Sequence, residues 1–134
     1  MLTPSERLER ILKVIEELDE LSEEMPVIVE GRRDVEALRL LGINGEVVTL
    51  GKGVPLFAFC ENISREWPST VVLTDWDRKG GQLARRLKEA FEANGVKVND
   101  SIRMALVILA KKEIKDIESL PSLVRRLQKA AKRS

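Results

Sequence analysis

Short apolar runs that alternate with amphipathic stretches constrain the fold most strongly. Four such runs have the composition of strands, and a helical pattern follows each of them. Strands that alternate with helices through short glycine-marked turns form a parallel sheet covered on both faces. We therefore predict an α/β fold with a mainly parallel, four-stranded, Rossmann-like sheet. The strands are expected at Val27 to Val29, Glu46 to Leu50, Val71 to Leu73 and Val96 to Val98.

The first 24 residues have the pattern of a long amphipathic helix. Thr3, Pro4 and Glu6 are typical of a helix start, because Thr caps, Pro fits the first turn and Glu reaches back to the cap. Apolar residues then recur every three or four positions. These are Leu8, Ile11, Leu12, Ile15, Leu18 and Leu21. The helix either lies on its own sheet, which we favour, or forms part of a dimer interface.

Further helices are expected after each strand. Asp34 is a plausible cap for the second helix, and the third and fourth should span about Val54 to Glu66 and Gln82 to Asn94. Residues 102–109 are apolar nearly all round, so periodicity alone does not separate helix from strand. We favour a helix because Asp100 and Ser101 can cap it.

At 134 residues the chain has the length of one compact domain. Within it we expect an N-terminal helix over 1–25, a central unit over 26–119 and a basic C-terminal helix over 120–134. The apolar runs are shorter than the roughly 18 to 20 residues of a membrane span, and the acidic start lacks the basic residues of a signal peptide. We expect a cytoplasmic protein with no membrane partner.

Missing residue types exclude several chemistries. The chain has no histidine, no tyrosine and one cysteine, Cys60, which argues against a zinc site, a Cys/His or Ser/His pair and a phosphotyrosyl intermediate. Carboxylates, Lys, Arg and a metal remain for chemistry. The net charge of +1 hides an acidic start and a basic end. The basic end is either a nucleic-acid footprint or a solvated helix face that attracts the acidic one.

Carboxylates follow two of the predicted strands. Asp75 and Asp77 come after the third strand and Glu30 after the first. If the third strand continued through Asp77, its two acids would point to the same side. Ligands of parallel sheets bind at the carboxyl ends of strands near the point where strand order reverses. If the two strands are neighbours there, three carboxylates converge, and a divalent cation would remove the cost of their repulsion.

Other interpretations of these residues stay open. The acids could instead be loop residues paired with Arg32, Arg33 or Arg78. Trp76 either packs against the core or stacks on a base, and we favour packing. Arg103 either partners one of the acids or has no role in the site.

Two segments together resemble the Toprim domain, which primases, topoisomerases, ribosomal-RNA maturase nucleases and small stand-alone archaeal proteins share. The first segment, Val29 to Leu38, has a glutamate followed by glycine at a strand end, and the second, Thr74 to Gly80, has Asp-x-Asp-x-x-Gly. The resemblance covers about Pro26 to Ser119. It implies that Glu30 is the acid/base residue or a metal ligand.

The resemblance also implies a wider site. It assigns Mg²⁺ or Mn²⁺ to Asp75 and Asp77, with Asp34 and Asp116 as further acidic positions and Glu118 as a weaker match. Asp34 can equally be a simple helix cap. Basic residues at positions that could meet phosphate or nucleic acid are Lys52, Arg78, Lys79 and Arg32.

Two functions follow as hypotheses. The first is a Mg²⁺-dependent enzyme that makes or breaks phosphodiester bonds in RNA or DNA. The second is a non-catalytic module that docks nucleic acid or a protein in a processing or repair complex. The chain lacks the zinc module of a full primase and the tyrosine of a topoisomerase, so the likeness stops at the domain. A homodimer and a larger complex both remain open as assemblies.

Overall fold

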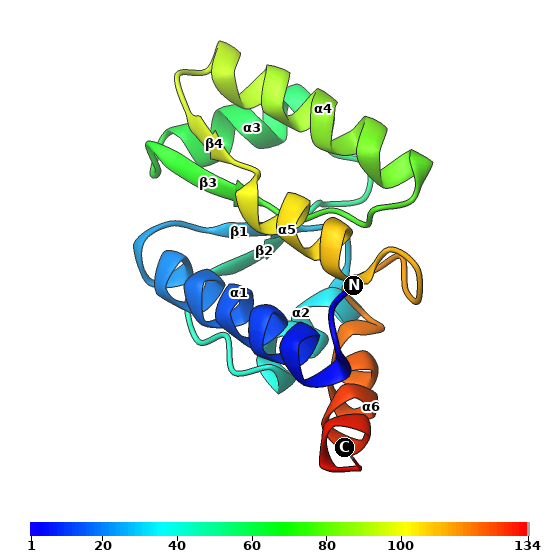
Figure 1. Ribbon diagram of the computed structural model, residues 1–134. Helices are drawn as coiled ribbons and strands as arrows, with labels where there is room; N and C mark the ends of the chain where they lie inside the picture. Colours follow the sequence, from blue (N-terminus) through cyan, green and yellow to red (C-terminus); the bar gives the residue numbers. More distant parts are fainter. Residues whose placement is uncertain (134) are drawn as a thin grey trace.

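The computed structural model describes residues 1–133. Its four strands form one sheet in the order β2-β1-β3-β4, and all three neighbouring pairs are parallel (Figure 1). Val27 pairs with Val47 on one side and with Val71 on the other. The predicted fold is confirmed. The strands are β1 (Val27–Val29), β2 (Val47–Thr49), β3 (Ser69–Val72) and β4 (Lys97–Asn99).

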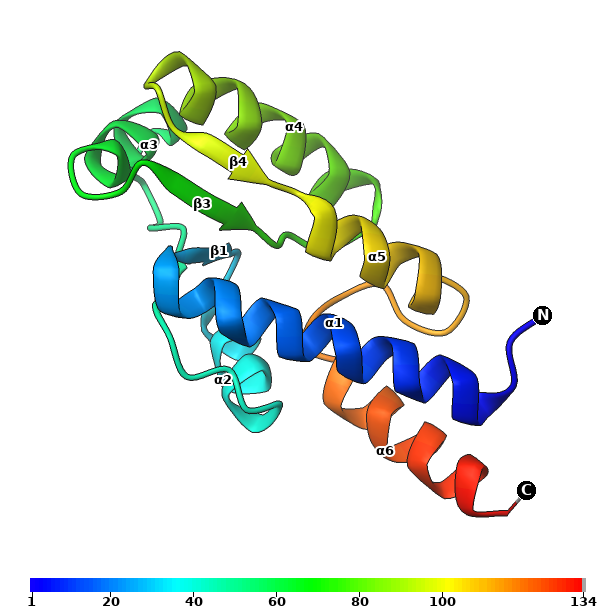
Figure 2. The same ribbon diagram turned by 60° about the vertical axis from the view of Figure 1, so that its left-hand side comes forward.

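Helices cover both faces of this sheet, as Figures 1 and 2 show. α3 and α4 lie on one face, and α1, α2, α5 and α6 lie on the other. The helices are α1 (Pro4–Glu24), α2 (Arg32–Leu40), α3 (Leu56–Ser64), α4 (Arg78–Ala93), α5 (Ser101–Ala110) and α6 (Leu120–Lys132). Within residues 1–133, no helix has the length and apolar character that crossing a membrane requires.

The alternation of side chains along β1 divides the interior into two cores. Val27 and Val29 point into the larger core with Leu18 of α1, whereas Ile28 points into the smaller core with Phe91 of α4. All of these side chains are buried. A strand buried on both faces is apolar throughout, which is why β1 appears in the sequence as a continuous apolar run.

The long helix α1 begins as predicted and packs on its own domain. The Glu6 N–H donates to Thr3 Oγ1 at 3.1 Å, and the Thr3 N–H donates to Glu6 Oε1 at 3.0 Å. Ile11, Ile15 and Leu18 are buried in the larger core, where α1 contacts α5 and α6 (Figure 2). Burying one stripe of the helix accounts for most of its apolar residues but not all of them.

Several predicted element ends were wrong. α4 begins at Arg78 rather than Gln82, because the Asp77 side chain caps it and its glycine pair is helical. Asp34 is not the N-cap of α2; it is the third residue of that helix and reaches back to Gly31. Residues 101–110 do form a helix, but the Asp100 side chain makes no capping hydrogen bond. The last predicted helix is α6, and Ser134 at its end lies outside the described residues.

Candidate functional site

The sheet topology brings Glu30 and Asp75 together. β1 and β3 are neighbours, and the chain leaves β1 for β2 on one side of the sheet but leaves β3 for β4 on the other. The strand order therefore reverses between β1 and β3, where ligands of α/β sheets bind. Glu30 follows β1 directly, and the backbone N–H of Asp75 donates to Glu30 Oε2 at 2.8 Å.

The Asp75 carboxyl is the most perturbed acid of this site. Its Oδ1 is inaccessible to water and has no hydrogen-bond partner among the described residues. Burial and, in decreasing order of strength, the nearby carboxylates of Glu30, Asp34, Asp116 and Asp77 together raise the pKa of Asp75 to about 7, and burial is the largest cause. Ionising this carboxyl is therefore costly unless a positive charge comes close to Oδ1.

Asp34 belongs to the same acidic group and also has a local structural role. Its side chain is only 8% exposed, and its Oδ2 accepts a hydrogen bond of 3.1 Å from the Gly31 N–H. Burial raises the pKa of Asp34, the Gly31 hydrogen bond opposes that effect, and Glu30 adds to it. Stabilising the first turn of α2 and contributing charge to the site are therefore compatible roles.

Asp77 lies at the start of a helix, and not on the continuing strand that its spacing from Asp75 had suggested. β3 ends at Val72, so Asp75 and Asp77 do not share one face of a continuing strand. Instead Asp77 is the N-cap of α4, and its Oδ1 accepts from the Gly80 N–H at 2.7 Å. One oxygen of this exposed carboxylate is thus committed to the helix start.

Gly80, the glycine of the Asp-x-Asp-x-x-Gly motif, is required by close packing. A Cβ at this position would lie 1.9 Å from the Asp75 carbonyl oxygen, a distance that no side chain tolerates. The Gly80 carbonyl also accepts a hydrogen bond of 2.8 Å from Thr74 Oγ1. The glycine therefore lets the start of α4 press against the segment that carries Asp75.

Arg103 of α5 holds the same segment from the other side. Its Nε donates to the Thr74 carbonyl at 3.2 Å and its Nη2 to the Asp75 carbonyl at 2.8 Å. Burial lowers the pKa of Arg103, and the charges of Glu30 and Asp75 oppose that effect. The sequence alone leaves the role of this residue undecided. The available signal was that Arg103 is the one charged residue in an otherwise apolar helix.

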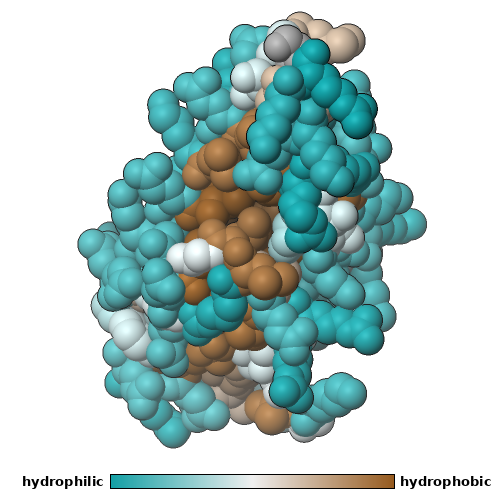
Figure 3. Space-filling view, turned by 90° about the horizontal axis from the view of Figure 1, so that it is seen from below, coloured by the Kyte–Doolittle hydropathy of each residue, from teal (hydrophilic) through white to brown (hydrophobic). Residues whose placement is uncertain are grey.

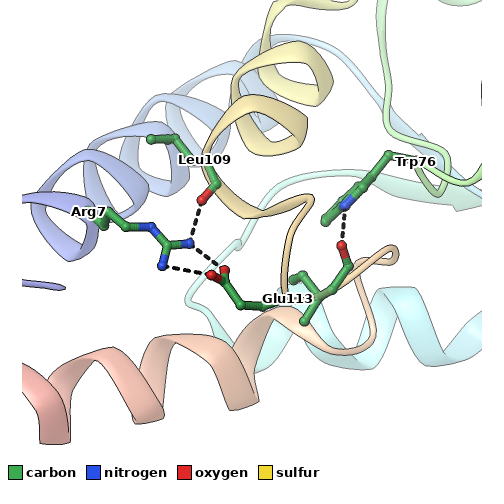
Figure 4. Close-up of polar contacts among 5 residues, drawn as sticks. Arg7, Trp76, Leu109 and Glu113 are labelled. Atoms are coloured by element: carbon green, nitrogen blue, oxygen red, sulfur yellow. Dashed lines mark hydrogen bonds and ion pairs between the residues drawn. The ribbon is translucent and has the colours of Figure 1, made fainter. Parts of the chain in front are cut away.

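Asp116 lies in the connection between α5 and α6. Contacts from Trp76 and Arg7 hold this part of the chain in place (Figure 4). The indole N–H of Trp76 donates to the Ile114 carbonyl at 2.7 Å, and the Arg7 guanidinium binds both the Leu109 carbonyl and the Glu113 carboxylate. The Asp116 Oδ1 accepts from the Ser119 N–H at 2.8 Å. Trp76 packs against the larger core, as predicted.

Arginines do not neutralise the acids at the strand ends. Arg32 pairs with Glu36 at 3.7 Å and Arg33 with Glu118 at 3.3 Å, both on exposed surface. Within residues 1–133 no ion pair includes Glu30, Asp75 or Asp77, so the interpretation of these acids as arginine partners was wrong.

The remaining predicted basic residues lie on the surface. Arg78 and Lys79 form the exposed first turn of α4, directly after Asp77. Lys52 is exposed in the connection between β2 and α3. None of these three residues takes part in an ion pair in the part of the chain that the structure describes.

The acids of the site are the type of ligand that a hard divalent cation prefers, although their side chains do not lie close together. Among residues 1–133, no three Asp, Glu or Cys side chains are close enough to form a ready-made metal-binding group. The donor set nevertheless consists of carboxylate oxygens, which Mg²⁺ and Mn²⁺ prefer. Among these oxygens, Asp75 Oδ1 is buried and accepts no hydrogen bond from any of residues 1–133.

Comparison with known proteins decides the family. Residues 26–108 match the sequence profile of the Toprim domain. The chain belongs to the Toprim family. This Toprim protein is 43% identical over 120 residues to a UPF0292 protein of Methanocaldococcus jannaschii, with 89% of this chain and 93% of that one covered. It is 41% identical over 123 residues to a UPF0292 protein of Pyrococcus horikoshii, with 91% and 89% covered.

The solved structure of an Aquifex aeolicus protein is also similar. It superimposes with a TM-score of 0.68 at 28% identity, covering 80% of this chain and 94% of that one. Toprim domains generally bind a divalent metal, and membership of the family supports a general role in nucleic-acid processing. The resemblance to Toprim domains, including stand-alone archaeal proteins, is confirmed.

Proposed function

We propose that this Toprim protein is a Mg²⁺- or Mn²⁺-dependent enzyme that acts on phosphodiester bonds of RNA or DNA. The observation that carries the proposal is the buried Oδ1 of Asp75, which has no hydrogen-bond partner within residues 1–133 and lies beside Glu30 at the point where strand order reverses. Maintaining such an arrangement costs stability, because burial and like charge both disfavour an ionised carboxyl. A site that binds a cation during its function explains why the cost is retained.

Each acid has a distinct role in this proposal. Asp75 and Asp77 hold the cation, and Asp34 and Asp116 add negative charge around it. A bound divalent ion supplies charge neutralisation for the phosphate and lowers the pKa of its water. Glu30 moves the proton: one of its oxygens is anchored on the Asp75 N–H, which orients the carboxylate and leaves the other oxygen for acid/base chemistry.

The substrate backbone meets the start of α4. The N-terminus of a helix favours phosphate through its free N–H groups and dipole, and Arg78 and Lys79 add two positive charges there. Lys52 supplies a further exposed charge from the β2–α3 connection. Arg32 contributes less, because its guanidinium already pairs with Glu36.

A second candidate function is a metal-binding module without turnover. Two observations favour it: one Asp77 oxygen is committed to capping α4, and no three acids form a ready-made group in residues 1–133. Such a module would bind nucleic acid with a steep dependence on salt, because phosphate contacts release counterions. Binding without cleavage under all metal conditions would select this function.

Thermal melting with and without Mg²⁺ or Mn²⁺ tests the metal site that both functions share. A ligand that binds only the folded state raises the melting temperature. We expect that rise in the wild type and in the control Glu36→Gln, whose side chain is exposed on α2 outside the acidic group. We expect its loss in Asp75→Asn. An equal rise in Asp75→Asn would contradict the site.

A further inference from the structure

One face of the molecule carries an apolar area that the chain itself does not cover. Figure 3 shows it as a hollowed brown region enclosed by hydrophilic side chains, on the side formed by α1, α2 and α6. Leu12 of α1 is 41% exposed and Leu40 of α2 is 77% exposed. Leu8 and Ala131 line a hollow between α1 and α6, and Leu40 and Pro121 line another between α2 and α6.

The two helices that border this area carry opposite charge. The exposed face of α1 next to Leu12 bears a stripe of acids at helical spacing, and the exposed face of α6 bears a stripe of bases. None of them forms an ion pair in the portion of the chain covered by the structure. The acidic stripe is Glu9, Glu16, Glu20 and Glu23, and the basic stripe is Arg125, Lys129 and Lys132.

We infer that this face binds a second copy of the same chain in a two-fold symmetric dimer. α1 and α6 pack side by side, so one copy presents an acidic border, an apolar centre and a basic border in that order. A two-fold axis that lies in the interface along the α1–α6 groove places each acidic stripe opposite the partner's basic stripe. An axis across the groove would place acid against acid.

Charge argues against an anionic surface, or a partner of one charge sign, as the occupant of this face. A nucleic acid or an anionic membrane would be attracted to α6 but repelled by the stripe on α1. A partner of one charge sign likewise satisfies one border only. A second copy satisfies both borders at once, since a two-fold interface brings the same patch of both subunits together.

Sedimentation velocity of the full chain over a dilution series from micromolar to submillimolar concentration tests the dimer. We expect a species of twice the 15.1 kDa chain mass. The double variant Leu12→Lys and Leu40→Lys should be monomeric with an unchanged circular dichroism spectrum, because both side chains are exposed. Ile108→Lys is the matched control: Ile108 is 73% exposed on α5, outside this face, and the variant should remain dimeric.

Charge reversal tests the orientation of the two copies. One variant carries Glu16→Lys and Glu20→Lys, and the other carries Arg125→Glu and Lys129→Glu. Each alone should be monomeric at low salt, because like charges then face each other. An equimolar mixture should form a heterodimer, in which every border again meets its opposite.

A wild type that stays monomeric over the whole series overturns the inference and assigns the face to a different protein. A dimer that persists in the Leu12 and Leu40 double variant also overturns it, because that dimer would use another surface. Neither result bears on the acidic site, whose test is the metal-dependent melting.

Discussion

Two groups of carboxylates in this protein differ in what surrounds them. The strand-end group comes from separate segments of the chain, whereas the α1 stripe comes from one helix. The strand-end group is Glu30, Asp34, Asp75, Asp77 and Asp116, and the α1 stripe is Glu9, Glu16, Glu20 and Glu23. The α1 stripe packs nearly as many acids into a shorter length of chain, yet all of its members are exposed to solvent.

Burial, and not the number of acids, distinguishes the two groups. Water and salt screen the repulsion among exposed helix acids. In the strand-end group Asp75 is desolvated, its Oδ1 has no partner in the described chain, and its backbone is fixed by Glu30 and Arg103. Acidic residues are therefore solvated surface charges on α1, whereas at the carboxyl ends of the central strands β1 and β3 they form the candidate metal site.

The largest expected difference between the two groups is in nucleic-acid cleavage when one acid of each group is neutralised. Glu30→Gln should lower metal-dependent cleavage of labelled RNA or single-stranded DNA by about 100-fold or more, because it removes the proposed acid/base group. Glu16→Gln should leave cleavage unchanged. Cleavage that survived equally in both variants would indicate a contaminating nuclease and would remove the distinction between the groups.

An added methyl group at Gly80, beside the strand-end group, should destabilise the fold far more than one at Gly31. Gly80→Ala should lower the free energy of unfolding by about 3 kcal/mol, since its Cβ would collide with the Asp75 carbonyl. Gly31→Ala is the control: an added Cβ there meets nothing within 4 Å, and the backbone φ is −152°. Urea denaturation of both variants measures the difference, and similar losses would argue against the close approach.

Arg103 should contribute more to the free energy of unfolding than an exposed arginine of α4. Arg103→Met removes the donors to the Thr74 and Asp75 carbonyls and should cost about 2 kcal/mol of unfolding free energy. Arg86→Met, at an exposed position, should change it by less than about 0.5 kcal/mol. Equal effects in denaturant titrations would mean that Arg103 does not support the Asp75 segment.

The raised pKa of Asp75 should make the stability of the metal-free protein depend on pH, and this effect is expected to be smaller than those above. Burial and the nearby carboxylates raise this pKa from 3.8 to about 7, so the folded state holds the proton over a range in which the unfolded chain has lost it. Stability of the metal-free protein should therefore fall as pH rises from 3.8 to about 7. Asp75→Asn should flatten this dependence and be more stable than the wild type at neutral pH by about 1 kcal/mol.

Thermal melts of both proteins across that range, recorded in chelator, check the prediction. Chelator matters because a bound cation would stabilise the ionised carboxyl and reverse the trend. A wild type whose stability rose with pH through this window would show that Asp75 is ionised in the metal-free fold.

Much of the fold could be predicted because local sequence and tertiary packing agree. The start of α1 follows from its capping box alone, and the parallel sheet follows from four apolar runs separated by helical patterns. Element ends were harder. The start of α4 was misplaced because Gly80 and Gly81 have the composition of a turn, and only the contact with the Asp75 carbonyl explains why glycine is helical there.

The proximity of Glu30 and Asp75 could be predicted from the sequence, but the backbone path that carries Asp77 could not. The motif identified Glu30, Asp75 and Asp77, yet the expectation that a continuing strand aligns the two aspartates was wrong. The role of Arg103 stayed undecided because its hydrogen bonds are to backbone carbonyls, which leave no complementary charge in the sequence.

The amino-acid sequence by itself determined the alternation of strands and helices and the acids that follow β1 and β3, because periodicity and turn chemistry are local. Only the tertiary structure decided which acids lose their water, where α4 begins and which leucines stay exposed. Those outcomes depend on the distance between segments far apart in the chain, such as Asp75 and Glu30, and local propensity carries no information about that distance.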